Sequence, residues 1–439
     1  MKQLFIFLLF IPFRMIAQDT LLVQEQAQMV LENCMKGKFS EATAFFDKDF
    51  AYRFNADNLA QTWSRVTTQL GQPVAEQKQL IYLEKVDSLL HVYQTIQFEK
   101  KELDLKMVFN STNKIIGWNF TPPSGKFSYK APSWVKPGQV REQDIQIPTA
   151  DLRLPGKLTL PSVGTNFPLI ILVQGSGPFD MDYTFGPNRV FKDLALSLAS
   201  LGFAVIRYDK RSLAYMSELM NVLPYLSPYE ETVQDVLAAI TFGAANEFVD
   251  SKNIFVLGHS FGGLMAPEIA LKSKQVKGLI LLAANAYSIQ DGILQQMKYL
   301  SKADSTLNKS VIDMEPKVRR VTSKNYADST DLTLLPMGKG APYWRYLNDY
   351  DQFKAAKDCK VPILLLQGER DYQVTMDEFK IWQTKLTDRP NVTFKSFPQL
   401  NHLFMQGTGP SLPSEYEKRS NVSLEVIEEI NNWLLRVVD

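Results

Sequence analysis

One serine in this 439-residue chain lies in a context that favours nucleophilic chemistry. Residues 258–263 have the sequence Gly-His-Ser-Phe-Gly-Gly, between an apolar run at 254–257 and a helix-forming run at 264–271. A serine at such a strand-to-helix turn is held in a strained conformation that exposes its hydroxyl group. Glycines two residues before and two after it leave room in the crowded turn, where a side chain would collide. The pattern predicts that Ser260 is a nucleophile.

A serine hydroxyl is a weak nucleophile at neutral pH and needs an adjacent base. The chain has three histidines. His259 adjoins Ser260 in the turn, so its side chain should point away from the nucleophile, and His91 is expected on the exposed face of an N-terminal strand. We therefore predict that His402, in a loop after a strand at 393–397, is the base.

A carboxylate beside the base would fix its tautomer and stabilise its protonated form. The predicted strand at 363–366 is followed by Gln-Gly-Glu-Arg-Asp, which offers Glu369 and Asp371. A carboxylate in this loop gives the order serine, acid, histidine along the chain.

The oxyanion that forms when a serine attacks a carbonyl carbon needs backbone N–H donors held in place. We expect one donor to be Phe261, the residue after the nucleophile. The other is expected from the loop after the strand at 169–173, which has the sequence Gln-Gly-Ser-Gly-Pro. Ser176 is our candidate there, with its neighbour Gly177 as the alternative.

The elements that must position these residues follow from the hydrophobic periodicity. Between 145 and 439, short apolar runs alternate with helical stretches, which is typical of a mostly parallel sheet with helices on both faces. Between 287 and 353 amphipathic helices replace the expected strand, and we predict a lid insertion there. The predicted strands lie at 169–173, 204–208, 254–257, 279–283 and 363–366, and the last helix at 424–438.

The N-terminal part predicts a separate small α+β domain at 19–121, in which helices precede antiparallel strands. A Pro- and Gly-containing linker is expected at 122–144. The predicted helical faces carry Leu21, Leu22, Met29 and Val30, and Leu59, Trp63, Val66 and Leu70; the predicted strand faces carry Leu90, Val92, Ile96 and Phe98, and Leu103, Leu105, Met107 and Phe109, with a third strand at 115–120.

The first 18 residues have the charged start, apolar middle and small-residue end of a secretory signal peptide, so we expect export. The apolar run at 4–13 is too short for a stable membrane anchor. A net charge of +1 gives no reason to expect nucleic acid as a partner. Cys34 and Cys359 are expected to be small buried apolar side chains, although the spacing leaves a disulfide open. No metal or organic cofactor is implied.

Several motifs resemble those of bacterial secreted α/β hydrolases related to the serine aminopeptidase and dienelactone-hydrolase groups. The resemblance covers about 145–439. It rests on Gly-Ser-Gly-Pro at 175–178 with Asp180 and Asp182, on Phe-Lys-Asp-Leu-Ala at 191–195, on Arg-Tyr-Asp-Lys-Arg at 207–211, and on the 258–263 turn. The small N-terminal domain resembles, in pattern only, the cone-shaped module of the nuclear-transport-factor type.

The resemblance implies an α/β-hydrolase fold and selects Asp371 over Glu369, because similar hydrolases carry their acid three residues after the glycine. The chain departs from these hydrolases at Gln174, where they usually have histidine. Because backbone atoms act in this loop, the departure weakens the argument from loop shape more than the catalytic argument. We interpret Asp209 and Arg211 as a structural ion pair.

These observations leave several functions open. The leading hypothesis is hydrolysis of small carboxylic esters through an acyl-Ser260 intermediate, and the resemblance adds an aminopeptidase acting on short peptides. A peptidase would need an acidic group for the substrate amine. A non-catalytic ligand-binding protein is a third hypothesis, and the N-terminal domain is a candidate ligand pocket or dimerisation face. The candidates for the acidic group of a peptidase are Glu315, Asp313 and Asp349.

The predicted lid also carries an aromatic cluster. It is expected either to line a pocket or to form the core of the lid, and it consists of Tyr343, Trp344, Tyr346 and Tyr350.

Overall fold

The computed structural model describes residues 14–74, 80–86, 89–121, 129–215, 219 and 222–438. The chain forms two compact units, one within Pro12–Ser128 and one that contains Tyr129–Asp439. Residues 1–13 of the predicted signal peptide lie outside the described residues, and helix α1 begins at Arg14. Within the described ranges, no helix is long and apolar enough to cross a membrane.

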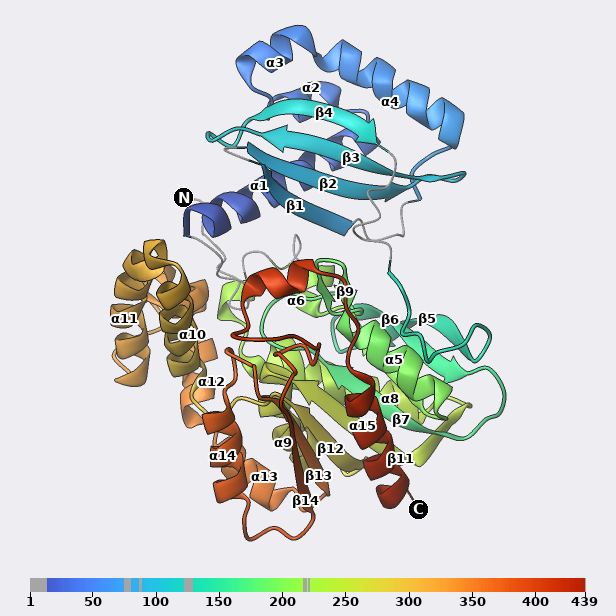
Figure 1. Ribbon diagram of the computed structural model, residues 1–439, viewed down its shortest axis with the longest axis vertical. Helices are drawn as coiled ribbons and strands as arrows, with labels where there is room; N and C mark the ends of the chain where they lie inside the picture. Colours follow the sequence, from blue (N-terminus) through green and yellow to red (C-terminus); the bar gives the residue numbers. More distant parts are fainter. Residues whose placement is uncertain are drawn as a thin grey trace. The chain divides into compact units, whose positions relative to one another are not determined.

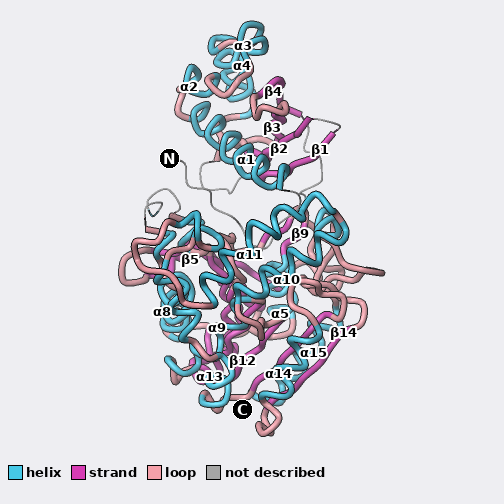
Figure 2. Tube along the Cα trace, turned by 90° about the vertical axis from the view of Figure 1, so that its left-hand side faces the viewer, coloured by secondary structure: helices cyan, strands magenta, loops and turns pink. Residues whose placement is uncertain are grey.

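The smaller unit is a four-stranded antiparallel sheet with four helices on one side of it (Figure 2). Alternate residues of its strands are buried, because only one face of the sheet is covered by helices. Figure 1 shows its elements, which are α1 (Arg14–Met35), α2 (Phe39–Thr43), α3 (Lys48–Arg53), α4 (Ala56–Leu70), β1 (Leu80–Val86), β2 (Leu89–Gln97), β3 (Glu102–Phe109) and β4 (Ile115–Thr121).

Three details of this unit differ from the sequence-based expectations. Strand β1 was not expected. Helix α1 buries Val23, Ala27 and Val30, whereas Met29, which was expected on the same face as Val30, is 49% exposed. His91 lies on the face opposite the core, as predicted, but it is half-buried rather than exposed.

The larger unit is built on an eight-stranded sheet with the order β14-β13-β12-β11-β7-β10-β6-β5. The six strands from β14 to β10 run parallel, and β6 and β5 form an antiparallel edge. The strands are β5 (Val140–Pro148), β6 (Arg153–Pro161), β7 (Phe167–Val173), β10 (Ala204–Tyr208), β11 (Val249–His259), β12 (Val276–Leu282), β13 (Ile363–Gly368) and β14 (Val392–Phe397), with a small pair, β8 (Thr184–Phe185) and β9 (Asn188–Arg189).

Helices cover both faces of this sheet, so each strand of its middle contributes to two cores. In β7, Leu169 and Ile171 pack in the core under α8 and α9, whereas Ile170 and Leu172 pack in the core under α5 and α15. This explains the continuous apolar runs in the sequence. The helices are α5 (Val190–Ser200), α6 (Arg211–Ala214), α8 (Gln234–Ala244), α9 (Phe261–Lys272), α13 (Gln352–Asp358), α14 (Met376–Lys385) and α15 (Leu424–Val437).

The predicted lid is an insertion of three helices between β12 and α13, namely α10 (Ile289–Ala303), α11 (Asn308–Thr322) and α12 (Ala341–Asp349). Ile289, Ile293, Met297 and Leu300, which lie at helical spacing on one face of α10, are all buried. The sheet, its covering helices and this insertion have the α/β-hydrolase architecture that the sequence predicted (Figure 1).

The predicted linker and ion pair need correction. Strand β5 begins at Val140, inside the segment expected to be a linker. Arg211 pairs with Asp235 (Nη2–Oδ1 2.6 Å) and with Asp151, and not with Asp209. Asp209 accepts a hydrogen bond from the Met181 N–H (2.7 Å).

Both cysteines are free thiols. Cys34 is buried in the smaller unit, and burial raises its pKa to about 12. Cys359 is half-buried. The expectation of small, mostly buried side chains is confirmed for Cys34, and no disulfide forms between the two.

Candidate active site

Ser260 lies between the last residue of β11 and the first residue of α9, in a backbone conformation that is rare for a residue with a side chain (φ 54°, ψ −119°). The adjacent glycines make this turn possible. A Cβ atom on Gly258 would lie 2.3 Å from the Gly262 carbonyl oxygen, and one on Gly262 would lie 2.2 Å from the Val173 carbonyl oxygen. The expected need for glycine at both positions is therefore confirmed, and the strain at Ser260 matches that of a nucleophile turn.

His402 and Asp371 form a buried pair. His402 Nδ1 lies 2.7 Å from Asp371 Oδ2, and both side chains are fully buried. Asp371 Oδ1 accepts from the backbone N–H groups of Gln373 (2.7 Å) and Val374 (3.0 Å), and the Gln367 amide donates to Oδ2 at 3.1 Å. The Asp371 carboxylate accepts hydrogen bonds from all of these groups. It therefore also accepts from His402 Nδ1, so Nδ1 carries the proton and Nε2 is left as an acceptor.

Two loops bring this pair together at the ends of neighbouring parallel strands. The Arg370 N–H donates to the Leu400 carbonyl (3.0 Å), and a Cβ atom on Gly368 would lie 2.5 Å from the same oxygen. The rejected candidate, Glu369, is exposed and accepts from the Ser396 hydroxyl. Asp371 is therefore the carboxylate of this loop that contacts His402.

Ser260 lines a small cavity, and the acceptor nitrogen of His402 is a buried atom. His402 Nε2 has no hydrogen-bond partner among the described residues, and Ser260 Oγ does not bond to it. The cavity measures about 20 Å³, which is room for about one water molecule. The lining residues are Ser176, Ser260 and Asn285, with Ile289, Gly292, Ile293 and Gln296 from α10.

The two candidate oxyanion donors meet the condition of being unpaired. In the part of the chain that the structure describes, the N–H groups of Phe261 and Ser176 have no acceptor. Phe261 is the first residue of α9, where an N–H has no partner within the helix. Ser176 lines the same cavity as Ser260, whereas its neighbour Gly177 does not.

Comparison with known proteins agrees with this architecture. A family model described as serine aminopeptidase, S33, matches residues 188–408. Esterase EstD of Thermotoga maritima is 31% identical over 421 residues, which cover 94% of this chain and 95% of that protein. The chain belongs to the serine aminopeptidase (S33) family. This S33-family protein is therefore an α/β hydrolase, and it is an enzyme.

Solved structures and a second family model were also found. Est1E of Butyrivibrio proteoclasticus is 17% identical (TM-score 0.45) and covers 67% of the S33-family protein and 98% of its own chain. The Pyrococcus furiosus esterase Pf2001 is 17% identical (TM-score 0.43), covering 71% and 97%. Residues 27–118 match a family described as a protein of unknown function (DUF3887). The likeness of this unit to nuclear transport factors stays a prediction, as does export.

His259 has a structural role in the S33-family protein that the sequence did not reveal. Its side chain points away from Ser260, as predicted, and its Nε2 lies 2.7 Å from the His402 carbonyl oxygen. Its Nδ1 lies 3.1 Å from the Tyr183 hydroxyl. Because a carbonyl only accepts, Nε2 carries the proton and Nδ1 accepts from Tyr183. His259 therefore anchors the loop that carries His402.

We expect this anchoring histidine to make the protein less stable in mild acid. Burial holds the pKa of His259 well below its ordinary value, and the nearby His402 lowers it further. The unfolded chain binds a proton there below about pH 6.5, whereas the folded chain does not. The stability from neutral His259 is thus present above pH 6.5 and is lost as the pH falls towards the folded-state pKa.

Between pH 7.5 and 5.5 this group should lower the free energy of unfolding by about 1.4 kcal/mol. Urea unfolding of the parent and of His259→Gln at both pH values measures the effect, since the variant lacks the titrating ring. Parallel pH profiles for the parent and His259→Gln would contradict the expectation.

The aromatic cluster of the lid packs against α9 rather than lining the cavity. The ring of Tyr343 stacks on Phe261, with 6.5 Å between centroids, and Trp344 is fully buried beside it. The Tyr350 hydroxyl donates to the Leu264 carbonyl, and the Tyr346 hydroxyl donates to Glu268. These contacts hold α12 and the residue after it against α9, the helix that follows Ser260.

The three acidic lid residues proposed for binding a substrate amine lie away from the cavity. Glu315 pairs with Lys298, and Asp349 pairs with Lys324. Neither they nor Asp313 line the cavity at Ser260, and no other described carboxylate does so.

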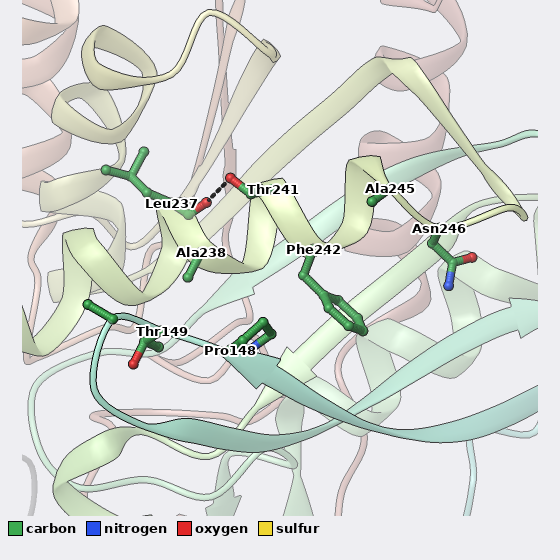
Figure 3. Close-up of a pocket in the computed structure, with 9 residues that line it drawn as sticks. Pro148, Thr149, Leu237, Ala238, Thr241, Phe242, Ala245 and Asn246 are labelled. Atoms are coloured by element: carbon green, nitrogen blue, oxygen red, sulfur yellow. Dashed lines mark hydrogen bonds between the residues drawn. The ribbon is translucent and has the colours of Figure 1, made fainter.

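A second hollow, of about 570 Å³, lies at the surface of the larger unit. Figure 3 shows Ala238 and Phe242 of α8 pointing towards Pro148 and Thr149 at the end of β5. None of the candidate catalytic residues lines it. We therefore assign the chemistry to the smaller cavity at Ser260.

Proposed function

We propose that this S33-family protein hydrolyses carboxylic esters through an acyl-Ser260 intermediate. The observation that carries the proposal is the buried 2.7 Å contact between His402 and Asp371, in loops anchored next to the strained Ser260 turn. A buried carboxylate that fixes a histidine tautomer near a strained serine turn has a defined chemical use, which is to activate the serine.

In the proposed acylation step, His402 Nε2 takes the proton of Ser260 Oγ as the oxygen attacks the ester carbonyl carbon. The negative charge on the carbonyl oxygen is stabilised by the N–H groups of Phe261 and Ser176. His402 then donates the proton to the departing alcohol, and the acyl group remains on Ser260. Asp371 stabilises the imidazolium that forms in between.

In the proposed deacylation step, His402 removes a proton from a water molecule, which attacks the acyl carbon. The same two N–H groups stabilise the second oxyanion. Collapse of this intermediate returns the proton to Ser260 and releases a carboxylic acid. These steps need no group beyond Ser260, His402, Asp371, the two backbone donors and water.

An ester is a better candidate substrate than a peptide with a free amino terminus. The described residues that line the cavity include the amides Asn285 and Gln296 but no carboxylate to bind an ammonium group. A buried ammonium group without a counter-charge is strongly disfavoured. The relative found at 31% identity is itself named an esterase, which supports the same choice.

A substrate panel tests this proposal. Purified protein is assayed with p-nitrophenyl esters of increasing acyl length and, in parallel, with aminoacyl p-nitroanilides. We expect turnover of esters, with kcat/KM at least 100-fold above that for any aminoacyl anilide. A preference for the anilides would replace the ester proposal with the aminopeptidase alternative. Turnover of neither class would remove both.

A further inference from the structure

The peptide group between Gly175 and Ser176 is held by a buried lysine. Lys210 Nζ donates to the carbonyl oxygen of this peptide at 2.9 Å. The preceding peptide group is also held, because the Gly175 N–H donates to the Tyr183 hydroxyl at 3.1 Å. Among the described residues, the Gly175 carbonyl oxygen is the one hydrogen-bond partner of the Lys210 side chain.

This peptide group also carries the Ser176 N–H, the candidate oxyanion donor. In a trans peptide the carbonyl and the following N–H point in opposite directions, and the described chain contains no cis peptide bond. Fixing the Gly175 carbonyl on Lys210 therefore directs the Ser176 N–H away from the lysine. Ser176 lines the cavity at Ser260.

Burying Lys210 costs free energy. The residue is 3% exposed, and a buried ammonium group needs opposite charges or hydrogen bonds to offset its loss of hydration. Glu231 and Asp235 supply favourable electrostatic interactions. Burial alone would raise the pKa of Glu231, but Lys339 and Lys210 outweigh it and hold that pKa at about 2. Glu231 and Asp235 therefore supply negative charge near Lys210, which contacts the Gly175 carbonyl oxygen.

We propose that Lys210 is a positioning residue that orients and polarises the oxyanion-hole peptide of this hydrolase. The inference rests on the proposed function, because it presumes attack by Ser260. A cationic donor on the carbonyl strengthens the N–H of the same peptide as a hydrogen-bond donor. This donor is worth most when the substrate oxygen carries a full negative charge, so the effect appears in the transition state and not in substrate binding.

The test compares Lys210→Met with the parent in steady-state ester hydrolysis. Active-site titration with a fluorophosphonate probe normalises the rates to folded enzyme. We expect kcat to fall 10- to 100-fold with KM changed less than about threefold. Affinity for a trifluoromethyl ketone, which forms an oxyanion on Ser260, should fall by the same factor as kcat. Lys210→Arg, which keeps the charge and the donors, should recover part of the loss.

Lys339→Met is the matched control. Lys339 belongs to the same buried charge group and pairs with Glu231 at 3.1 Å, but it does not contact Gly175. We expect it to lower stability and leave kcat within about threefold of the parent. Should Lys210→Met fail to fold, Lys210→Gln, which is shorter and uncharged, gives the same comparison.

The outcomes separate this inference from the proposed function. If the parent hydrolyses esters and its Ser260 takes up the probe, but the Lys210 variants retain parental kcat, the role of Lys210 is wrong and the esterase proposal stands. The same holds if Lys210→Met and Lys339→Met lose kcat equally, or if KM changes and kcat does not. A parent that neither turns over esters nor takes up the probe overturns the proposed function itself.

Discussion

Ser260→Ala is expected to lower kcat for ester hydrolysis by about 10⁶-fold, since loss of the serine of a serine–histidine–aspartate triad has an effect of that size. The variant keeps the oxyanion donors, the cavity and His402, so KM should change little. It should also lose all labelling by a fluorophosphonate, which reacts with an activated serine. Stopped or steady-state assays with a p-nitrophenyl ester and gel-based detection of the probe measure both.

Ser273→Ala is the matched control for this variant. Ser273 caps the other end of α9, and its hydroxyl accepts from the Gln275 N–H. Its activity and labelling should equal those of the parent. If Ser260→Ala retained labelling or more than a thousandth of the parental kcat, another residue would be the nucleophile and the acyl-Ser260 mechanism would be lost.

Asp371→Asn is expected to lower kcat by about 10⁴-fold with little change in fold. The asparagine side chain is nearly the same size, and its oxygen can still accept from the N–H groups of Gln373 and Val374. Its amide group would then face His402 Nδ1 as a donor. The histidine would adopt the other tautomer, with its proton on Nε2, and could not accept the proton of Ser260.

Glu369→Gln is the control, because it makes the same chemical change two residues away in the same loop. Glu369 is exposed and bonds to Ser396, so this variant should keep the parental kcat. Circular dichroism and urea unfolding should show that Asp371→Asn is folded. A folded Asp371→Asn enzyme with kcat within tenfold of the parent would exclude Asp371 as the residue that fixes the base.

The small cavity at Ser260 leads to a kinetic expectation. It has room for about one water molecule between α10 and Ser260, so we expect a displacement of α10 to admit substrate. We expect this motion to precede the proposed acylation and to contribute to kcat. Because Tyr343, Tyr346 and Tyr350 fasten α12 to α9, the opening motion is expected at α10, where the lining is limited to apolar and amide side chains.

The sequence determined those parts of the protein that depend on local pattern. Strands buried on both faces are continuous apolar runs, so β7 and β10 to β13 were predictable. The edge strands β5 and β6 were missed, because β5 alternates polar with partly buried residues and begins in a segment that resembles a linker. The glycines around Ser260 and the scarcity of histidine were also local signals, and they indicated Ser260 and His402.

Tertiary structure alone decided the contacts between residues far apart in the chain. Asp371 meets His402 across 31 residues because β13 and β14 are neighbours whose loops share backbone hydrogen bonds. A side chain that bonds to a distant carbonyl, as Lys210 does to Gly175, leaves no periodic or motif signal. The same reason hid the role of His259 and the true partner of Arg211. The sequence therefore indicated which groups do the chemistry, and packing between distant segments determined what holds them in place.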